Sequence, residues 1–332
     1  MEVMMIAPGP LNSICDVEGI TVGNAEDHGL TTGVTVVLPD RACPAVVDHR
    51  GGGIGSRACT VLAPGSEMPE VHAITLSGGS AFGLDAPGGV MHGLSTAGRG
   101  YEIGGQRVPI VPGSIIFDLL TGGPKEWEHP PWWELGHKAH KGAGKSFALG
   151  NAGAGIGATA GPLKGGLGTA SFRADTYTVG SVAVANPVGS VVIPGTNSFR
   201  AWHLAQGDEV GIQTPPATQA DLWDGTPEGP AMANTTLTVV ATDAKLSRDH
   251  LHRIAIMAQD GMAQAVRPVH SPLDGDTVYV LSTMARYIDP TPATVARLGT
   301  LAADTVARSI MRGVYEAESL AGVPSYREVH GR

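Results

Sequence analysis

The chain has 332 residues and a net charge of −9 at pH 7 with the histidines neutral; 42% of its residues are hydrophobic and 16% are charged. This composition excludes a disordered chain and provides a substantial core for one large or two ordinary domains. No run of lysine and arginine indicates a nucleic-acid-binding face. No apolar stretch of about 18 residues predicts a membrane helix, and the N-terminal segment lacks the parts of a secretory signal. We therefore expect a cytoplasmic protein with no nucleic-acid or membrane partner.

The residues that most often bind metals are sparse in this chain. The three cysteines, Cys15, Cys43 and Cys59, cannot all pair and have no metal-ligand spacing. Reduced thiols in the cytoplasm fit them best. The histidine pairs within residues 137–140 and 250–252 lack a third ligand at a sensible spacing. We expect no metal and no cofactor.

The first half of the chain predicts short strands and one glycine-rich turn. Residues 20–47 alternate apolar runs with turns, which is typical of strands in a mostly antiparallel sheet. A further strand at residues 73–76 runs into the turn SGGSAFGLD, which is expected to open a helix. The backbone N–H groups of Gly78 and Gly79 in this turn suit an anion or oxyanion. Tight packing at a strand-to-helix corner is the alternative.

The middle of the chain is less regular. Residues 121–145 place three tryptophans among prolines, histidines and lysines, which indicates a surface excursion whose tryptophans cover a core edge or line a pocket mouth. Residues 179–192 predict a strand that Asn186-Pro187 interrupts and that then resumes. Residues 205–233 are polar and rich in proline and glycine, which is typical of a mobile linker.

The pattern becomes regular after this segment. It predicts a strand over residues 235–243, a helix over 247–266 capped by Ser247, a strand over 275–283 and a helix over 292–315 capped by Thr291. A strand-helix-strand-helix unit therefore begins at Thr235.

Two nucleotide-binding patterns also occur. Residues 139–146 match a relaxed phosphate-loop pattern, but residues 130–138 do not form the buried strand that such a loop follows. Residues 153–158 match the dinucleotide fingerprint, with Asp175 at about the right distance. The next residues cannot form the long helix that this fingerprint opens. A phosphate-loop NTPase stays as a third alternative.

The dipeptide Asn234-Thr235 places a hydroxyl group directly after a carbonyl group that it could attack. An N→O acyl shift followed by hydrolysis would release a new chain that begins with Thr235. Its α-amine could take the proton of the hydroxyl, which is a known way to activate threonine. The alternative for the same residues is the start of a buried strand.

Ten stretches in order along the chain resemble one family. They are VEGITVGN, GVTVVLP, VVDHRGGGIG, ITLSGGSAFGLDA, PIVPGSIIFDL, NAGAGIGATAGPLKGGLGTAS, VAVANPVG, NTTLTVVATDA, RIAIMAQDGMAQAVRPVHSPLDGDTVYVLST and the C-terminal helix. Together they resemble the self-processing aminopeptidases and amidases, which include L-aminopeptidase D-Ala-esterases, β-peptidyl aminopeptidases, a pantetheine hydrolase and nylon-oligomer hydrolases. Only residues 121–148 and 196–230 fall outside the resemblance.

The resemblance implies a fold and a processing step. The fold would be an α/β four-layer αββα sandwich, with the layers of an Ntn hydrolase but different connectivity. A single domain of residues 1–332 would be cut into a large subunit of residues 1–234 and a small subunit of residues 235–332. The subunits would stay together and form homo-oligomers, tetramers or larger.

The resemblance also implies roles for three residues of the site. Thr235 would be the nucleophile, and Asn186 would hold the nucleophile or the oxyanion. Lys164 would lower the pKa of the α-amine or orient Thr235 through its charge. From the spacing alone, a turn residue before proline is the favoured interpretation of Asn186, and a surface residue on a turn is an equal alternative for Lys164.

Asp274 and Asp276 indicate which branch of the family the chain resembles. Two residues apart on an extended segment, they would face one side, where their protonation would couple; a turn before a strand is the alternative. The nylon-oligomer and pantetheine hydrolase branch has two aspartates here, whereas the β-aminopeptidases have serine and glutamate. Phe117 stands where several members have an oxyanion-binding tyrosine, and phenylalanine cannot donate that bond. Gly78, Gly79 or Asn186 would then hold the oxyanion.

The resemblance therefore predicts an N-terminal-threonine hydrolase of amide bonds. A linear ω-amino-acid amide such as a 6-aminohexanoate oligomer is the favoured substrate. Short peptides or β-peptides are the second choice. A non-catalytic oligomeric binding protein with the same fold is the alternative of another class, which Phe117 and an uncut chain would favour.

Overall fold

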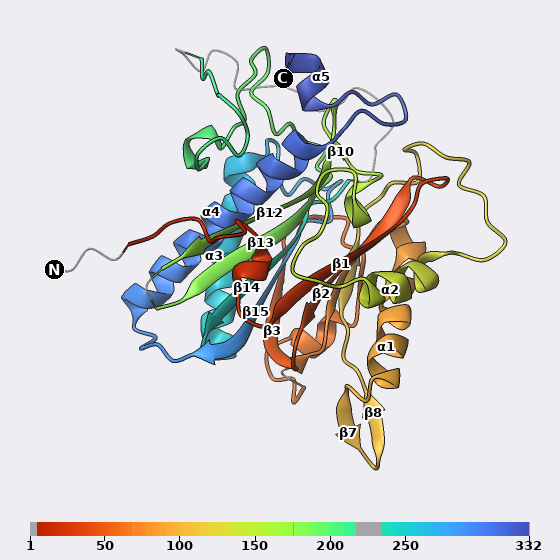
Figure 1. Ribbon diagram of the computed structural model, residues 1–332, viewed down its shortest axis with the longest axis vertical. Helices are drawn as coiled ribbons and strands as arrows, with labels where there is room; N and C mark the ends of the chain where they lie inside the picture. The colour runs from red at the N-terminus through yellow and green to blue at the C-terminus, as the bar shows by residue number, and fades with distance from the viewer. Residues whose placement is uncertain (1–4, 69, 175, 217–233, 332) are drawn as a thin grey trace.

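The computed structural model of the chain describes residues 5–68, 70–174, 176–216 and 234–331, in which two facing sheets are covered by helices on their outer faces (Figure 1). The six-stranded sheet has the order β12 (Gly166–Arg173), β13 (Thr178–Ala185), β14 (Leu237–Ala244), β15 (Thr277–Arg286), β3 (Cys43–His49) and β5 (Glu70–Val71). The five-stranded sheet has the order β1 (Ile20–Asp27), β2 (Thr32–Pro39), β6 (Ile74–Ser77), β9 (Gly113–Ile115) and β4 (Ser56–Arg57).

The helices divide between the two outer faces. They are α1 (Ala86–Thr96), α2 (Trp132–Lys141), α3 (Arg248–Ala265), α4 (Pro292–Glu316) and the short α5 (Tyr326–His330). Two small pairs complete the described strands, β7 (Tyr101–Ile103) with β8 (Gln106–Val108), and β10 (Thr159–Ala160) with β11 (Leu163–Lys164). The 3-10 turns are η1 (Ile14–Asp16), η2 (Cys59–Leu62), η3 (Ser80–Asp85), η4 (Gly153–Gly155) and η5 (Trp202–Leu204).

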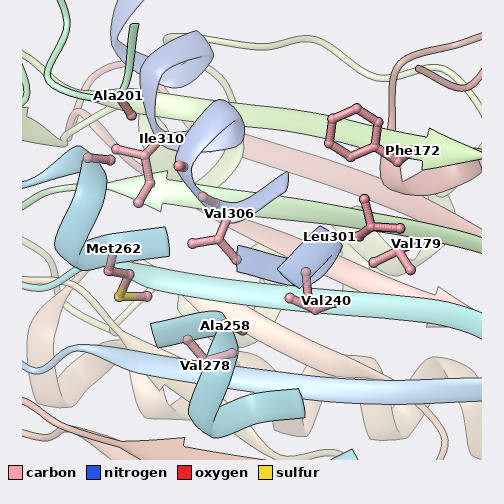
Figure 2. Close-up of a cluster of buried hydrophobic side chains, with 14 of the residues drawn as sticks. Phe172, Val179, Ala201, Val240, Ala258, Met262, Val278, Leu301, Val306 and Ile310 are labelled. Carbon is pink, nitrogen blue, oxygen red and sulfur yellow. The ribbon is translucent and has the colours of Figure 1, made fainter. Parts of the chain in front are cut away.

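Strand alternation explains the four layers. Val240 of β14 packs with α3 and α4, whereas its neighbours Val239 and Ala241 pack between the two sheets. Figure 2 shows the cluster under α3 and α4, with Met262 and Val306 close to the six-stranded sheet. A third cluster packs α1 and α2 on the five-stranded sheet. The expected αββα sandwich is confirmed.

The regular C-terminal unit forms where the sequence predicts it. Helices α3 and α4 differ from the predicted ranges by one residue at each end or less. Their caps explain this agreement, because Ser247 accepts from the His250 N–H and Thr291 accepts from the Thr294 N–H. The glycine-rich turn after β6 also opens a helix as expected, through η3 and α1.

Three expectations about the first two-thirds of the chain are corrected. The strands in residues 20–47 do not share one sheet, because β1 and β2 belong to the five-stranded sheet and β3 to the other. A surface excursion is wrong for residues 132–141, which form α2 with Trp132 fully buried, although Trp127 does pack against the edge of the third cluster. The strand at Asn186-Pro187 resumes only as two isolated bridges, Ser190 with Arg267 and Val192 with Phe199.

Both nucleotide-binding patterns lie in unsuitable structure. Residues 139–146 begin within the last turn of helix α2 and do not follow a strand. Gly153–Gly155 is one 3-10 turn that leads into β10, with no helix after it. Asp175 lies outside the described residues. In the part of the chain that the structure describes, no helix is long and apolar enough to cross a membrane.

The expected linker is anchored at its start. Residues 217–233 lie outside the described residues, but Val210 is buried and Glu209 forms an ion pair with the fully buried Arg308 of α4. Two nitrogens of Arg308 donate to the two carboxylate oxygens of Glu209, each at 2.7 Å. Asn12 bonds to both partners. A mobile linker is therefore wrong for the residues around Glu209.

The pair explains the state of the Glu209 carboxylate. Burial alone would raise the pKa of Glu209, but the hydrogen bonds and charge of Arg308, with Asn12 and the Gln206 N–H, hold it below its usual value. This ion pair therefore holds the segment around Glu209 against helix α4.

We expect Glu209→Gln to lower the free energy of unfolding by about 3 kcal/mol at pH 7, because it leaves Arg308 buried without a counter-charge. The pKa of Glu209 is lower in the folded chain, so this stabilisation is present above pH 4.5 and is lost as the pH falls further. The difference in the free energy of unfolding between wild type and Glu209→Gln, measured by urea unfolding, should therefore become smaller below pH 4.5. Glu102→Gln, at the exposed pair with Arg107, is the matched control and should cost less than about 0.5 kcal/mol. Equal losses in both variants would contradict this expectation.

Candidate active site

The peptide bond between Asn234 and Thr235 lies just before the start of β14, one of the two central strands of the six-stranded sheet. Residues 234–236 lead into β14, which pairs in parallel with β15 and antiparallel with β13. The Asn234 N–H donates to the Leu273 carbonyl at 3.1 Å, and the Thr277 N–H donates to the Thr236 carbonyl at 3.1 Å. The segment is therefore held against the turn that precedes β15.

The Thr235 side chain is 3% exposed, and its hydroxyl group lies beside the carbonyl group that it would attack. The hydroxyl donates to the Asn234 carbonyl oxygen. The Gly275 N–H reaches both oxygens, at 3.0 Å from Thr235 Oγ1 and 3.1 Å from the Asn234 oxygen. One backbone donor therefore serves the nucleophile and the carbonyl that would become an oxyanion.

Gly275 was missed from the sequence, where it appeared only as the spacer between two aspartates. A Cβ atom there would lie 2.6 Å from Thr235 Oγ1 and 2.7 Å from the Gly53 carbonyl oxygen, so only glycine fits. The Gly53 N–H in turn donates to the Asp274 carbonyl at 2.7 Å. The DGD spacing was the available signal, because glycine permits this close approach.

The two carboxylates flank Thr235, and each is 1% exposed. Asp276 accepts from the Thr236 N–H at 2.8 Å and bonds the His270 ring at 2.8 Å. Asp274 accepts from the Val188 N–H at 3.0 Å and from the Ser271 hydroxyl. Burial and then the charge of Asp276 raise the pKa of Asp274, against the hydrogen bonds that it accepts. Among the described residues, the hydroxyl of Thr235 bonds to Asn234 and Gly275 and to neither carboxylate.

Lys164 is fully buried, so the surface-turn alternative is wrong. Its ammonium group donates to the carbonyl groups of Gly155, Ala158 and Gly165 at 2.8–3.0 Å. Burial lowers its pKa to about 7, against the opposite effect of the Asp118 charge. Lys164 is therefore a buried base that titrates near neutral pH.

Asn186 directly follows β13 and links the region around Lys164 to Thr235. Its main-chain carbonyl accepts from the Thr235 N–H at 2.8 Å. Its side chain accepts from the Thr159 N–H at 2.8 Å and donates to the Phe117 carbonyl at 3.4 Å. Thr159 directly follows Ala158, a partner of Lys164. Asn186 therefore contacts Thr235 through its backbone, and Lys164 is linked to Asn186 only through Ala158 and Thr159.

The glycine-rich turn uses its donors within the fold. The Gly78 N–H donates to the Gly33 carbonyl at 2.8 Å, and the Gly79 N–H donates to Asp118 Oδ1 at 2.8 Å. In this arrangement both N–H groups are already bonded within the fold, so the turn fits the alternative of tight packing at a strand-to-helix corner. Half-buried Phe117 offers its carbonyl to Asn186, and burial raises the pKa of its neighbour Asp118. Asp118 was missed, although an acidic residue inside the apolar run SIIFDLL is a usable signal.

Comparison with known proteins gives the family. The model of peptidase family S58 matches residues 12–327. Proteins named uncharacterized aminopeptidases from Mycobacterium bovis and Mycobacterium tuberculosis are each 42% identical over 342 residues, covering 96% of this chain and 98% of theirs. A 6-aminohexanoate-oligomer endohydrolase from Kocuria sp. is 28% identical over 295 residues, covering 83% of this chain and 76% of that protein.

Solved structures agree on the fold. The L-aminopeptidase D-Ala-esterase/amidase of Ochrobactrum anthropi, described as a new variant among the Ntn hydrolase fold, superposes with a TM-score of 0.70 at 20% identity, covering 98% of this chain and 94% of that one. A Burkholderia sp. β-aminopeptidase superposes with a TM-score of 0.69 at 20% identity, with the same coverage. On the family match and the 42% identical relatives, the chain belongs to peptidase family S58, a family of peptidases and amidases.

Proposed function

We propose that this chain cuts itself between Asn234 and Thr235 and then acts as an N-terminal-threonine hydrolase of amide bonds. The observation that carries the proposal is the contact of the Thr235 hydroxyl with the Asn234 carbonyl, with the Gly275 N–H within hydrogen-bond reach of both oxygens. This geometry combines the nucleophile, the scissile carbonyl and a donor for the developing negative charge.

The cut proceeds by an acyl shift. Thr235 Oγ1 attacks the Asn234 carbonyl carbon, and the Gly275 N–H stabilises the resulting oxyanion. The hydroxyl proton passes to the Thr235 nitrogen, whose bond to the Asn234 carbonyl carbon breaks, while Asp274, Asp276 and Lys164 set the charge around the site. Water then hydrolyses the ester, which leaves a carboxylate on Asn234 and an α-amine on Thr235.

Catalysis reuses the same atoms. The α-amine keeps the Asn186 carbonyl as its hydrogen-bond partner and takes the proton of its own hydroxyl group. A substrate carbonyl takes the place that the Asn234 carbonyl occupies in the uncut chain, and therefore meets the same Gly275 N–H. Attack releases the amine product, and water hydrolyses the acyl-enzyme.

A linear ω-amino-acid amide such as a 6-aminohexanoate oligomer is the substrate that we favour. Relatives named 6-aminohexanoate-oligomer endohydrolases support it, as do the paired Asp274 and Asp276 and the absence of a hydroxyl group at Phe117. Aminopeptidase action on short peptides or β-peptides is the second candidate, which the 42% identical relatives favour by name. We also propose a cytoplasmic homo-oligomer, a tetramer or larger.

We expect intact mass to find two pieces, residues 1–234 and 235–332, and Thr235→Ala to leave one uncut and inactive chain. Thr236→Val is the matched control, because the Thr236 hydroxyl is buried without a hydrogen-bond partner among the described residues. The Thr236→Val chain should be cut and active, since the Thr236 hydroxyl takes no part in the proposed reaction. A wild-type chain that stays uncut after long incubation, or a Thr235→Ala chain that is still cut, would reject the proposal and favour a non-catalytic binding protein.

Lys164 should make the free energy of unfolding depend on pH. Its pKa is about 7 in the fold against a usual 10.5, so between these values the unfolded chain binds more protons. The free energy of unfolding should therefore rise by about 1.4 kcal/mol per pH unit across this window. Lys164→Met should remove that slope and slow hydrolysis at least tenfold, as measured by urea unfolding from pH 7.5 to 9.5 and by amine release. An unchanged slope would show that another group titrates there.

A further inference from the structure

Gly275 supplies the donor of the proposed site, and it has no side chain that could fix its own backbone. Without a Cβ atom, φ and ψ are free, so the direction of the Gly275 N–H depends on what holds the peptide groups on either side. The N–H shares one planar peptide group with the Asp274 carbonyl, and the Gly275 carbonyl belongs to the next. Contacts with these two carbonyl groups therefore set where the N–H points.

The glycines of residues 51–53 hold the first of these peptide groups. The Gly53 N–H donates to the Asp274 carbonyl at 2.7 Å. A Cβ atom on Gly51 would lie 2.2 Å from the same carbonyl oxygen, so the close approach of the two segments requires glycine there. Backbone contacts alone therefore fix the Asp274 carbonyl.

A side chain holds the second peptide group. The Thr277 hydroxyl donates to the Gly275 carbonyl at 2.9 Å, and among the described residues no backbone N–H bonds that carbonyl. The His49 ring contacts the same hydroxyl, with Nδ1 at 2.9 Å from Thr277 Oγ1. Since a hydroxyl has one hydrogen and a carbonyl can only accept, the Thr277 hydrogen is committed to Gly275. His49 Nδ1 must therefore carry the hydrogen of its own contact with Thr277.

The surroundings of the two side chains favour this direction of hydrogen bonding. Thr277 is fully buried, on the strand that pairs with His49 on one side and with Leu237 of β14 on the other. Burial lowers the pKa of His49, against the charge of Asp48, so the ring is neutral at pH 7. A neutral ring carries one hydrogen, which leaves Nε2 bare when Nδ1 is the donor.

We propose that His49 and Thr277 are positioning residues for the oxyanion donor, because the chain from His49 Nδ1–H through Thr277 Oγ1 to the Gly275 carbonyl orients the Gly275 N–H. The inference rests on the proposed function, in which that N–H stabilises the oxyanion of self-cleavage and of amide hydrolysis. A misdirected donor weakens binding of the transition state more than binding of the substrate, so its loss lowers kcat and leaves KM unchanged.

Hydroxyl variants test the proposal. Thr277→Val keeps the shape of the side chain, and it should slow self-cleavage and the kcat of amine release about tenfold or more, a part of the loss that follows removal of a whole oxyanion donor. Self-cleavage is measured by intact mass during cell-free synthesis, and amine release with a 6-aminohexanoate trimer, for which KM should stay unchanged. Thr277→Ser keeps the hydroxyl and should retain both rates within about threefold, although it loses a buried methyl group.

Thr242→Val is the matched control. It removes a buried hydroxyl that donates to the Thr178 carbonyl at 2.8 Å, farther along β14. The Thr242→Val chain should lose stability to urea as Thr277→Val does, and should keep both rates.

The half-buried His49 ring supplies a second test that leaves Thr277 intact. Nitrogen NMR of the wild type at neutral pH should find hydrogen on Nδ1 and none on Nε2. His49→Leu should slow both reactions, and His49→Asn should restore them, because its amide nitrogen stands one bond from Cγ as Nδ1 does.

The outcomes separate this role from the proposed function. Wild-type rates in Thr277→Val, or hydrogen on His49 Nε2, would overturn the positioning role while self-cleavage stands. Equal slowing in Thr277→Val and Thr242→Val would also overturn it, because the effect would then follow from lost stability. A wild-type chain that stays uncut would instead reject the hydrolase, and with it the role of its donor.

Discussion

The parallel pairing of β14 with β15 is the constraint on which the proposed site depends. It sets residues 234–236 beside residues 273–277 at the point where both strands begin. That register brings the Gly275 N–H to the Asn234 carbonyl and the Asp276 carboxylate to the Thr236 N–H. A shift by one residue would turn Thr235 to the opposite face of the sheet and separate all these contacts.

The C-terminal unit could be predicted from the sequence because its signals are local. Apolar residues at helical spacing, caps at Ser247 and Thr291 and a β-branched run after Thr235 each act within a few residues. Pro187 marked the end of β13 for the same reason, since proline cannot continue a strand ladder. The candidate residues themselves came from the ordered motifs; in the structure Asn186, Asp274 and Asp276 contact residues 234–236 or their neighbours, whereas Gly78 and Gly79 bond to Gly33 and Asp118.

What the sequence could not indicate depends on partners far along the chain. Trp132 and Glu209 stand in polar, proline-rich stretches, and only the packing against α1 and Arg308 shows that they are buried. The donors of Gly78 and Gly79 looked free until Gly33 and Asp118 were placed beside them. Spacing within one segment cannot show that a backbone N–H is already bonded to a residue far along the chain, because every residue except proline carries the same N–H group.

The proposed cut has an electrostatic consequence within the same geometry. It replaces a neutral carbonyl with a carboxylate that would stand beside two buried carboxylates, Asp274 and Asp276, where like charges are costly. The new α-amine of Thr235 stays with the Asn186 carbonyl, in a strand that pairs on both sides. Repulsion would therefore act on the new carboxylate of Asn234 and not on Thr235, and it would favour withdrawal of Asn234 from the site. Its departure would leave Thr235 Oγ1 as the remaining acceptor of the Gly275 N–H, and a substrate carbonyl would take the place of the Asn234 oxygen.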